Sequence, residues 1–415
     1  MKNVCIIGGG AAGLMAAYAA SLNGHKVVVF EKNEKLGKKI YITGKGRCNF
    51  TNDTSPQEFM ENIVRGKKFL TGAIYSFPPQ KTIEFFENHG MLVKIERGNR
   101  AFPVSDHASD VTKALERAIV SNGVEVRLKE EVQSITTSDK IPMSDIAGKN
   151  TFFIDTNSGR YSFDEVVVAT GGVSYPTTGS TGDGYKFAKE YGHNVTDLRS
   201  GLCGLNLEGA WFKELQGLTL KNVSITVKNN EKLVYDDFGE LLFTHFGISG
   251  PIVLSASSLI NRLPLKNLKI TIDLKPALDE ETLDKRLLRD FEKYKNKQIS
   301  NALCELLPQK FISILLSSCG ISEKKNVNVL TKEERKQLVK TLKFFPLKIK
   351  SLRGFEEAII TSGGIELSEI NPKTMESKKI KGLRFCGEVL DVDAFTGGFN
   401  LQIAFSTGFA AGNSI

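Results

Sequence analysis

The first 31 residues contain the pattern that most constrains how this chain can fold. A β-branched apolar run, KNVCIIG, leads directly into the glycine spacing Gly8-x-Gly10-x-x-Gly13. A helix of small residues is expected next, Gly24 ends it, and a second apolar strand, KVVVFE, closes on Glu31. This order of strand, glycine turn, helix, strand and acid is typical of a Rossmann unit that binds a dinucleotide.

Each position in this unit has a physical task. Gly8 permits the tight turn, Gly10 lets the backbone approach a pyrophosphate, and Gly13 allows close contact between helix and strand. The helix N-terminus attracts the negative charge of the phosphates. A carboxylate at the end of the second strand can accept hydrogen bonds from an adenosine ribose, and it disfavours a 2′-phosphate. The predicted nucleotide contacts are Gly8, Gly10, Ala11, Ala12, Gly13, Glu31 and Lys32.

Two later stretches favour FAD over NAD as this dinucleotide. The segment FDEVVVATGG, residues 163–172, is an apolar strand that ends in Ala-Thr-Gly-Gly. Residues 382–412 contain a predicted strand, then a Gly-Glu pair and a Gly-Gly turn, and a predicted last helix from about Asn400. No second GxGxxG follows the first, which argues against a dedicated Rossmann domain for NAD(P)H.

Motifs spread along the whole chain carry a family resemblance. They are IIGGGAAGLMAA, GKGRCNFTN, ATGGVSYPTTGSTGDGY, LLFTHFGISGPIVLSAS and CGEVLDVDAFTGGFNLQIAFSTG. With them the chain resembles, from end to end, the three-domain bacterial flavoproteins known as NAD(P)/FAD-dependent oxidoreductases. That group includes aminoacetone-oxidase-like enzymes and BaiN-like bile-acid reductases. The motifs are specific to the family and much less specific to any one substrate.

The resemblance implies how FAD would be held. Adenine would take a backbone contact near Val132, and Glu388 would lie by the ribityl or phosphate region. The helix that starts near Asn400 would direct its positive end at the pyrimidine edge of the flavin. Beyond the N-terminal unit, the implied contacts are Gly44, Gly46, Arg47, Cys48, Asn49, Val132, Thr170, Gly171, Gly387, Glu388, Gly397, Gly398, Phe399 and Asn400.

The stretch TGKGRCNFTN could be a phosphate-binding loop, a redox-thiol site, a nucleic-acid-binding loop or the lining of a flat cofactor. It is not a Walker loop, because no Ser or Thr follows its Gly-Lys pair. Cys48 has no cysteine partner nearby, so we interpret it as a residue that lines the flavin. Arg47 or Lys45 can offset phosphate or flavin charge, and Asn49 can bond the ring edge. Because both cations would favour the Cys48 thiolate, a flavin-adduct role stays open.

The pattern changes between about residues 196 and 355. Short strands with a turn at Asn229-Asn230 are expected first, followed by a helix in GPIVLSASSLI and a strand in LKNLKITIDLKP. Helical stretches are then expected over 279–297, 300–318 and 331–345. The last of these begins with the capping-box spacing Thr331-x-x-Glu334.

The predicted fold class is α/β, with a discontinuous Rossmann-type FAD-binding domain. This domain comprises residues 1–195 and 356–415. The predicted insertions are a β-rich, barrel-like subdomain over 196–277 and a small helical subdomain over 278–355.

Charge and cysteine usage bear on location and partners. The chain has 55 Lys and Arg against 47 Asp and Glu, a formal charge of +8. This balance suits a soluble protein with an anionic cofactor, and it leaves nucleic acid open as a partner. Six scattered cysteines without a CxxC argue against disulfides and a zinc site and for a reducing, cytoplasmic setting. The uncharged N-terminal run is better interpreted as strand, turn and helix than as a membrane span.

The predicted function is an FAD-dependent oxidoreductase that transfers hydride between flavin N5 and a small organic substrate, with NADH or NADPH as the candidate donor. Its direction stays open between reduction of an activated C=C and oxidation of an amine or alcohol-like carbon. His245 is the candidate general acid or base, with a structural role as the alternative, and Cys48 is a second candidate.

Two rival hypotheses remain. In the first, the protein interacts with or modifies RNA through the basic inserted residues Lys336, Lys340, Lys343, Lys348, Lys350 and Arg353, although interleaved aromatic residues for base stacking are not evident. In the second, it is a redox sensor whose FAD is structural.

Overall fold

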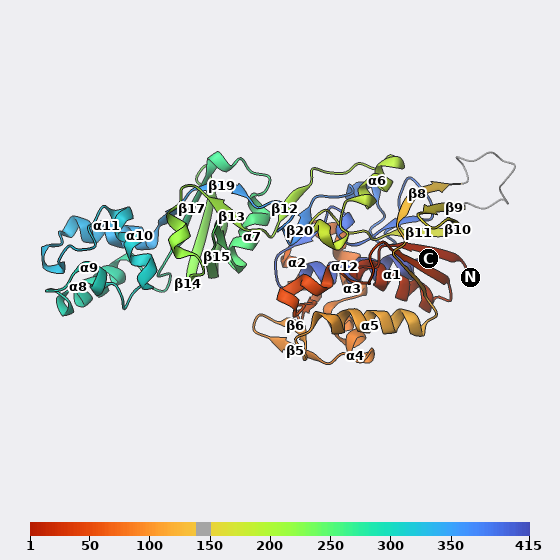
Figure 1. Ribbon diagram of the computed structural model, residues 1–415, viewed down its shortest axis with the longest axis horizontal. Coiled ribbons are helices and arrows are strands. Elements are labelled where there is room, and N and C mark those ends of the chain that lie inside the picture. Colours follow the sequence, from red (N-terminus) through yellow and green to blue (C-terminus); the bar gives the residue numbers. More distant parts are fainter. Residues whose placement is uncertain (138–150) are drawn as a thin grey trace. The chain divides into compact units, whose positions relative to one another are not determined.

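The chain forms two compact units. The computed structural model describes residues 1–137 and 151–415. Unit 1 comprises Met1–Ser200 and Phe355–Ile415, and unit 2 comprises Gly201–Gly354. Unit 1 is therefore assembled from two separate stretches of chain, while unit 2 is one continuous insertion between them (Figure 1).

A parallel five-stranded sheet forms the centre of unit 1. Its β1 strand is buried on both faces, as expected for an apolar run without polar alternation. The strand order is β21 (Leu383–Phe385), β11 (Glu165–Val168), β1 (Asn3–Ile7), β2 (Lys26–Glu31) and β7 (Glu125–Leu128). Strands β1 and β21, from the two ends of the chain, thus flank β11.

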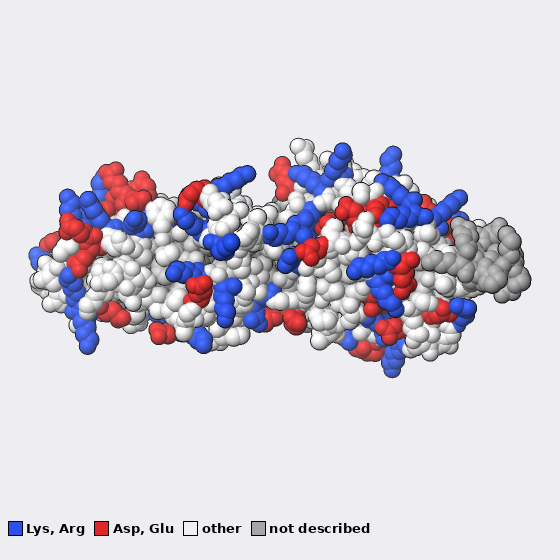
Figure 2. All heavy atoms as spheres, turned by 90° about the horizontal axis from the view of Figure 1, so that it is seen from above, with Lys and Arg blue, Asp and Glu red and all other residues white. Residues whose placement is uncertain are grey.

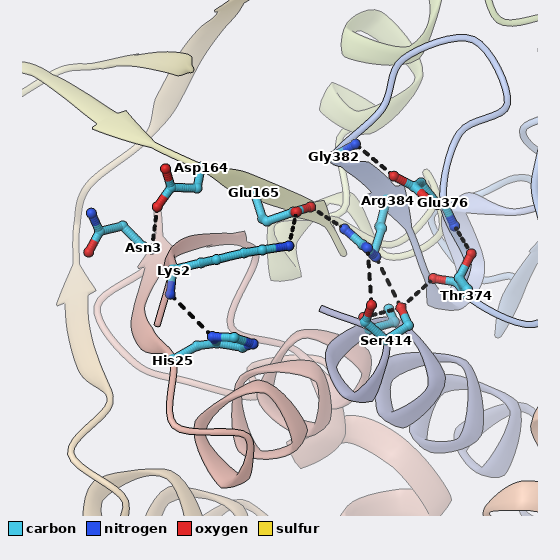
Figure 3. Close-up of polar contacts among 11 residues, drawn as sticks. Lys2, Asn3, His25, Asp164, Glu165, Thr374, Glu376, Gly382, Arg384 and Ser414 are labelled. Carbon is cyan, nitrogen blue, oxygen red and sulfur yellow. Dashed lines mark hydrogen bonds and ion pairs between the residues drawn. The ribbon is translucent and has the colours of Figure 1, made fainter. Parts of the chain in front are cut away.

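Charged side chains close the amino edge of this sheet (Figure 3). The Glu165 carboxylate accepts a hydrogen bond from Lys2 Nζ at 2.6 Å and pairs with Arg384 on its other oxygen. Arg384 is buried and donates from Nε to Ser414 Oγ at 3.1 Å, which ties the last helix to the sheet. The opposite, carboxyl edge is where open α/β sheets bind their ligands.

Smaller sheets surround this centre, together with seven α-helices in the described part of unit 1. Two of these sheets are antiparallel and have three strands: β8 (Val132–Thr137), β9 (Phe152–Thr156) and β10 (Arg160–Phe163), and β3 (Thr51–Asn52), β5 (Val93–Glu96) and β6 (Arg100–Pro103). Two further sheets have two strands each: β4 (Ile63–Arg65) with β22 (Asp393–Ala394), and β12 (Arg199–Gly201) with β20 (Ile360–Ser362). The helices are α1 (Ala11–Leu22), α2 (Pro56–Glu61), α3 (Lys67–Ser76), α4 (Pro79–Asn88), α5 (Ala108–Ser121), α6 (Asp183–Glu190) and α12 (Phe399–Asn413).

Unit 2 combines an antiparallel seven-stranded sheet with helices. The strand order is β18 (Phe345–Leu347), β17 (Leu268–Asp273), β14 (Thr219–Asn229), β15 (Lys232–Phe243), β16 (Gly247–Ser249), β13 (Leu205–Leu207) and β19 (Ile349–Leu352). The helices are α7 (Pro251–Ile260), α8 (Glu280–Lys293), α9 (Ile299–Ala302), α10 (Gln309–Cys319) and α11 (Lys332–Lys343).

The structure differs from the expected division of the insertion. One buried apolar cluster contains Phe243 of the sheet together with Leu287 and Leu316 of the helices, so sheet and helices share a core. Strands β18 and β19, which lie within the stretch predicted to be helical, join the sheet.

Two local expectations in unit 2 also need correction. The helix expected over 300–318 is interrupted: α9 ends at Ala302, and α10 begins only after Pro308, its N-cap residue. Proline is disfavoured inside a helix because it lacks the N–H donor and clashes with the preceding turn. The hairpin turn lies at Asn230 and Glu231, whose φ angles are 46° and 67°, one residue later than expected. The capping box at the start of α11 is confirmed.

A membrane-spanning helix would need a long apolar segment. Within 1–137 and 151–415, no helix combines the length and the hydropathy required to cross a bilayer.

Candidate functional site

The glycine loop between β1 and α1 is shaped by close backbone contacts. Gly8 N–H donates to Phe30 O at 2.9 Å, and a Cβ added to Gly8 would lie 2.6 Å from Ala169 O. By contrast, a Cβ on Gly10 would meet open space, and no side chain caps α1. Because the first N–H groups of a helix lack intrahelical partners, this end of α1 can receive an anion such as a pyrophosphate.

Glu31 faces this loop from the end of β2. Its Oε2 accepts the Gly9 N–H at 2.8 Å, and its Oε1 accepts the Asn33 N–H at 2.8 Å. Lys32, which follows it, donates from Nζ to Asp183 at 2.6 Å. The carboxylate predicted to bind ribose is thus held beside the predicted pyrophosphate site, whereas the Lys32 charge is already paired.

Val132 is the first residue of β8, and Glu130, two residues before it, contacts the end of β2. The N–H of Glu130 donates to Glu31 O at 3.1 Å, and Val132 pairs with Thr156 of the neighbouring strand. The structure therefore brings the start of β8 toward the nucleotide-binding strand, but it does not test the predicted adenine contact.

The TGKGRCN loop has an unusual backbone. Gly44, Lys45, Gly46 and Cys48 have φ angles of 60°, 57°, 86° and 58°. Such left-handed conformations are unfavourable for residues other than glycine, and they cluster at functional sites. The segment is therefore held in shape by its surroundings rather than by local preference.

Arg47 helps to hold this loop through contacts with β5, β6 and the turn that follows β6. Its Nε donates to Asp106 at 2.8 Å, its guanidinium also pairs with Glu96, and it lies 4.4 Å from the centre of the Phe102 ring. Arg47 is thus paired with two acids, and its predicted contact with phosphate or flavin stays an untested prediction. Lys45 is exposed and has no ion pair among the described residues.

Cys48 is buried within the loop, and this burial raises the pKa of its thiol. The expectation that nearby cations favour its thiolate is wrong, because burial disfavours the charged thiolate and Arg47 is paired with acids. A lining role fits the burial, and a catalytic role for Cys48 remains an untested prediction.

The end of the same loop packs on the start of α12. Asn52 Nδ2 donates to Gly397 O at 3.1 Å, and a Cβ on Gly398 would lie 2.8 Å from Asn49 Oδ1. Asn400 folds back to bond Ala394, with its Oδ1 accepting the N–H at 2.9 Å. The first turn of α12 and residues 49–52 therefore form one continuous surface.

Glu388 joins the carboxyl edge of the sheet to the loop after β2. Its Oε1 accepts the Thr361 N–H at 2.7 Å, and its Oε2 accepts a hydrogen bond from Lys39 Nζ at 2.8 Å. Gly387 has a φ of 77°, and a Cβ there would lie 2.7 Å from Ala12 Cβ at the start of α1. A Cβ on Gly171 would lie 3.9 Å from Glu388 Oε2.

The hydrogen-bonding groups of these residues are compatible with bound FAD. Asn49 Oδ1 and Thr170 Oγ1 are buried and have no hydrogen-bond partner among the described residues. Buried polar atoms without partners are rare in proteins, so each calls for a ligand or water. Together with two helix starts that no side chain caps and the Glu31 carboxylate, they are polar groups of the kind that could bind a flavin dinucleotide.

The predicted residues fall into two groups. All of the predicted cofactor contacts lie in unit 1. His245 lies in unit 2 on the exposed loop between β15 and β16, with its ring 5.1 Å from that of Phe246. Its role as a general acid or base stays a prediction.

Sequence reasoning missed two residues of this region, Lys39 and Asn52. Asn52 lies inside the TGKGRCNFTN stretch, so that motif could have identified it. Lys39 gave no such signal, because its partner Glu388 lies 349 positions away.

Comparisons with known proteins identify the family of this chain. The family described as HI0933-like protein Rossmann domain matches residues 2–414. The chain is 30% identical over 418 residues to 3-dehydro-bile acid delta(4,6)-reductase of Clostridium scindens, covering 100% of this chain and 99% of that protein. It is also 30% identical over 411 residues to ribosomal RNA dihydrouridine synthase of Escherichia coli, covering 99% of this chain and 97% of that protein.

A solved structure shows the same fold. The 3-ketosteroid-delta4-(5alpha)-dehydrogenase from Rhodococcus jostii RHA1 aligns with a TM-score of 0.53 at 15% identity, covering 100% of this chain and 96% of that one. At this identity the likeness concerns the fold alone.

Proposed function

Because this chain belongs to the HI0933-like Rossmann-domain family and is an FAD-dependent oxidoreductase, we propose that it works as a reductase of an activated carbon–carbon double bond. The observation that carries the proposal is the pair of full-length relatives. One is named a delta(4,6)-reductase and the other a dihydrouridine synthase. Dihydrouridine differs from uridine by two hydrogens across one C=C, so both names describe saturation of a double bond.

We propose roles for the site residues from their positions. Bound FAD supplies two-electron redox chemistry, and the protein supplies binding, orientation and electrostatics. The start of α1 would hold the pyrophosphate and Glu31 the adenosine ribose. Asn49 would bond the flavin edge beside the first turn of α12, whose positive end stabilises negative charge on the ring.

We further propose NADH or NADPH as the electron donor. The sequence contains one GxGxxG fingerprint, which the proposed FAD site would use. A nicotinamide donor would therefore act as a visiting co-substrate without a Rossmann domain of its own.

A second candidate substrate class is RNA, and the charge distribution favours it. Unit 2 contains 25 Lys and Arg against 17 Asp and Glu, whereas unit 1 contains 30 of each kind. The whole net charge of +8 is thus carried by the insertion. On the face shown in Figure 2, however, blue basic and red acidic side chains are interspersed over both units.

Only some of the basic residues first considered for RNA are available. Lys343 is engaged, because its Nζ lies 2.5 Å from an oxygen of Asp273. Arg353 lies 4.5 Å from the centre of the Phe246 ring. The exposed lysines that remain are Lys336, Lys340, Lys348 and Lys350.

Anaerobic reduction tests both candidates in one experiment. The FAD-loaded protein is titrated with NADH and with NADPH while the flavin absorbance is followed, and then a conjugated enone or an unmodified ribosomal RNA transcript is added. We expect one nucleotide to bleach the flavin and one acceptor to restore its colour. A mass gain of two hydrogens identifies the product. Absence of flavin reduction by both nucleotides would contradict the reductase proposal and favour an oxidase.

A further inference from the structure

Lys39 makes an ion pair within the predicted FAD site that no motif anticipates. It lies in the loop after β2, and its Nζ donates to Glu388 Oε2 at 2.8 Å. The side chains retain 27% and 20% of their exposure, so the pair is partly shielded from water. We propose that Lys39 is a positioning residue of the FAD site: it neutralises Glu388, so that the carboxylate does not repel the phosphates. This inference rests on the proposed FAD site.

The backbone fixes where Glu388 lies. Gly387 contacts the first turn of α1, because a Cβ there would lie 2.7 Å from Ala12 Cβ. Its N–H donates to Thr407 Oγ1 of α12 at 3.0 Å. Glu388 is thus held beside the helix start that attracts anions. The positive end of α1 would attract both this carboxylate and the cofactor phosphates. The carboxylate would therefore lie near the phosphates and repel them unless a cation offsets its charge.

The other oxygen of Glu388 has a different task. It accepts the N–H of Thr361 at 2.7 Å, and Thr361 Oγ1 accepts the N–H groups of Val173 and Ser174 at 2.8 and 3.1 Å. These bonds orient the carboxylate but bring no positive charge. Among the described residues, Lys39 is the cation that pairs with Glu388.

A competing role for Lys39 makes the opposite prediction. If Lys39 instead bound a cofactor phosphate directly, its loss would weaken FAD binding whatever residue stands at 388. If it acts by neutralising Glu388, its loss matters only while Glu388 is charged. The combination of Lys39→Met with Glu388→Gln therefore separates the two roles.

The experiment measures FAD affinity of the full-length protein by flavin fluorescence after removal of bound FAD. We expect Lys39→Met to raise the Kd about fivefold at low salt, the upper end of the range for a partly exposed ion pair. Lys39→Arg, which keeps the positive charge, should bind FAD about as tightly as the unaltered protein does. The increase in Kd caused by Lys39→Met should shrink as salt is added, because ions screen the repulsion. In the Glu388→Gln background, Lys39→Met should change the Kd by less than about threefold.

Lys35→Met is the matched control. It removes the same charge from the same loop, but Lys35 is exposed and lies over the Tyr41 ring at 4.1 Å, away from Glu388. An unchanged Kd in Lys39→Met, or an equal loss with and without Glu388→Gln, would overturn the inference. Failure of the unaltered protein to bind FAD would instead contradict the proposed function.

Discussion

His193 has both ring nitrogens bonded inside unit 1. Nδ1 lies 3.1 Å from Glu369 Oε2, and Nε2 lies 2.8 Å from Ser377 Oγ. The Ser377 oxygen already accepts the backbone N–H groups of Lys379 and Ile380. Its hydroxyl must therefore donate, so Nε2 accepts and the imidazole is neutral with its proton on Nδ1.

This arrangement predicts a dependence of stability on pH. Burial lowers the pKa of His193, although Glu369 opposes the shift and Lys379 adds to it. The unfolded chain then binds the proton more readily than the native protein does. Stability should therefore fall as the pH drops below about 6.5, by at most about 1.4 kcal/mol per pH unit.

This prediction is checked by measuring the free energy of unfolding in urea at pH 7.5 and 5.5 for the unaltered protein and for His193→Gln. The variant should be less stable at pH 7.5, and the difference between the two proteins should narrow at pH 5.5. Since other groups titrate in both proteins, only the difference is informative. A constant difference would show that His193 does not titrate in this range.

At the scale of elements, α1 and α12 approach so closely that glycine is required between them. A Cβ added to Gly408 of α12 would lie 2.3 Å from Ala12 O, and one on Gly412 would lie 2.1 Å from Ala16 O. These contacts join the two helices whose starts form the predicted FAD site. The packing that stabilises unit 1 thus also sets the cofactor geometry.

Gly408→Ala should therefore destabilise the protein by about 1–3 kcal/mol, the cost of overpacking, and should weaken FAD binding. Urea unfolding and FAD titration measure the two effects. Gly72→Ala in α3 is the control, because its Cβ would lie 3.8 Å from the nearest atom, Pro372 O. That change should be neutral or should stabilise the helix by up to about 1 kcal/mol. Equal effects of the two substitutions would contradict the packing argument.

Element prediction succeeded where the determinants were local. The strand–glycine–helix unit at the N-terminus follows from residue spacing, and so does the capping box at Thr331 and Glu334. It failed where one residue interrupted a pattern, as Pro308 does between α9 and α10. It also failed for β18 and β19, because membership of a sheet depends on distant partner strands.

At the scale of the whole molecule, the predicted cofactor contacts all lie in unit 1, while the net charge lies in unit 2. FAD stabilises the state to which it binds, and hydrogen exchange reports that gain locally. We expect added FAD to slow exchange in peptides that contain residues 8–13, 43–52 and 387–400. Peptides within 201–354 should exchange at unchanged rates.

Mass spectrometry of peptic fragments provides this measurement, with unit 2 as the internal control. Protection of residues 244–250 on FAD addition without protection of residues 8–13 and 43–52 would contradict the assignment of the cofactor site to unit 1. Protection of residues 244–250 in addition to those segments would leave that assignment intact. It would also strengthen the prediction that His245 acts on the substrate.

The sequence by itself determined the Rossmann unit, the choice of FAD and the presence of an insertion. These features depend on residue types at short spacings, which determine the local conformation of the chain. Tertiary structure decided the pairing of Lys39 with Glu388, the neutralisation of Arg47 by Glu96 and Asp106, and the raised pKa of the Cys48 thiol. Charge pairing and burial depend on which distant segments meet when the core forms, and no local spacing contains that information.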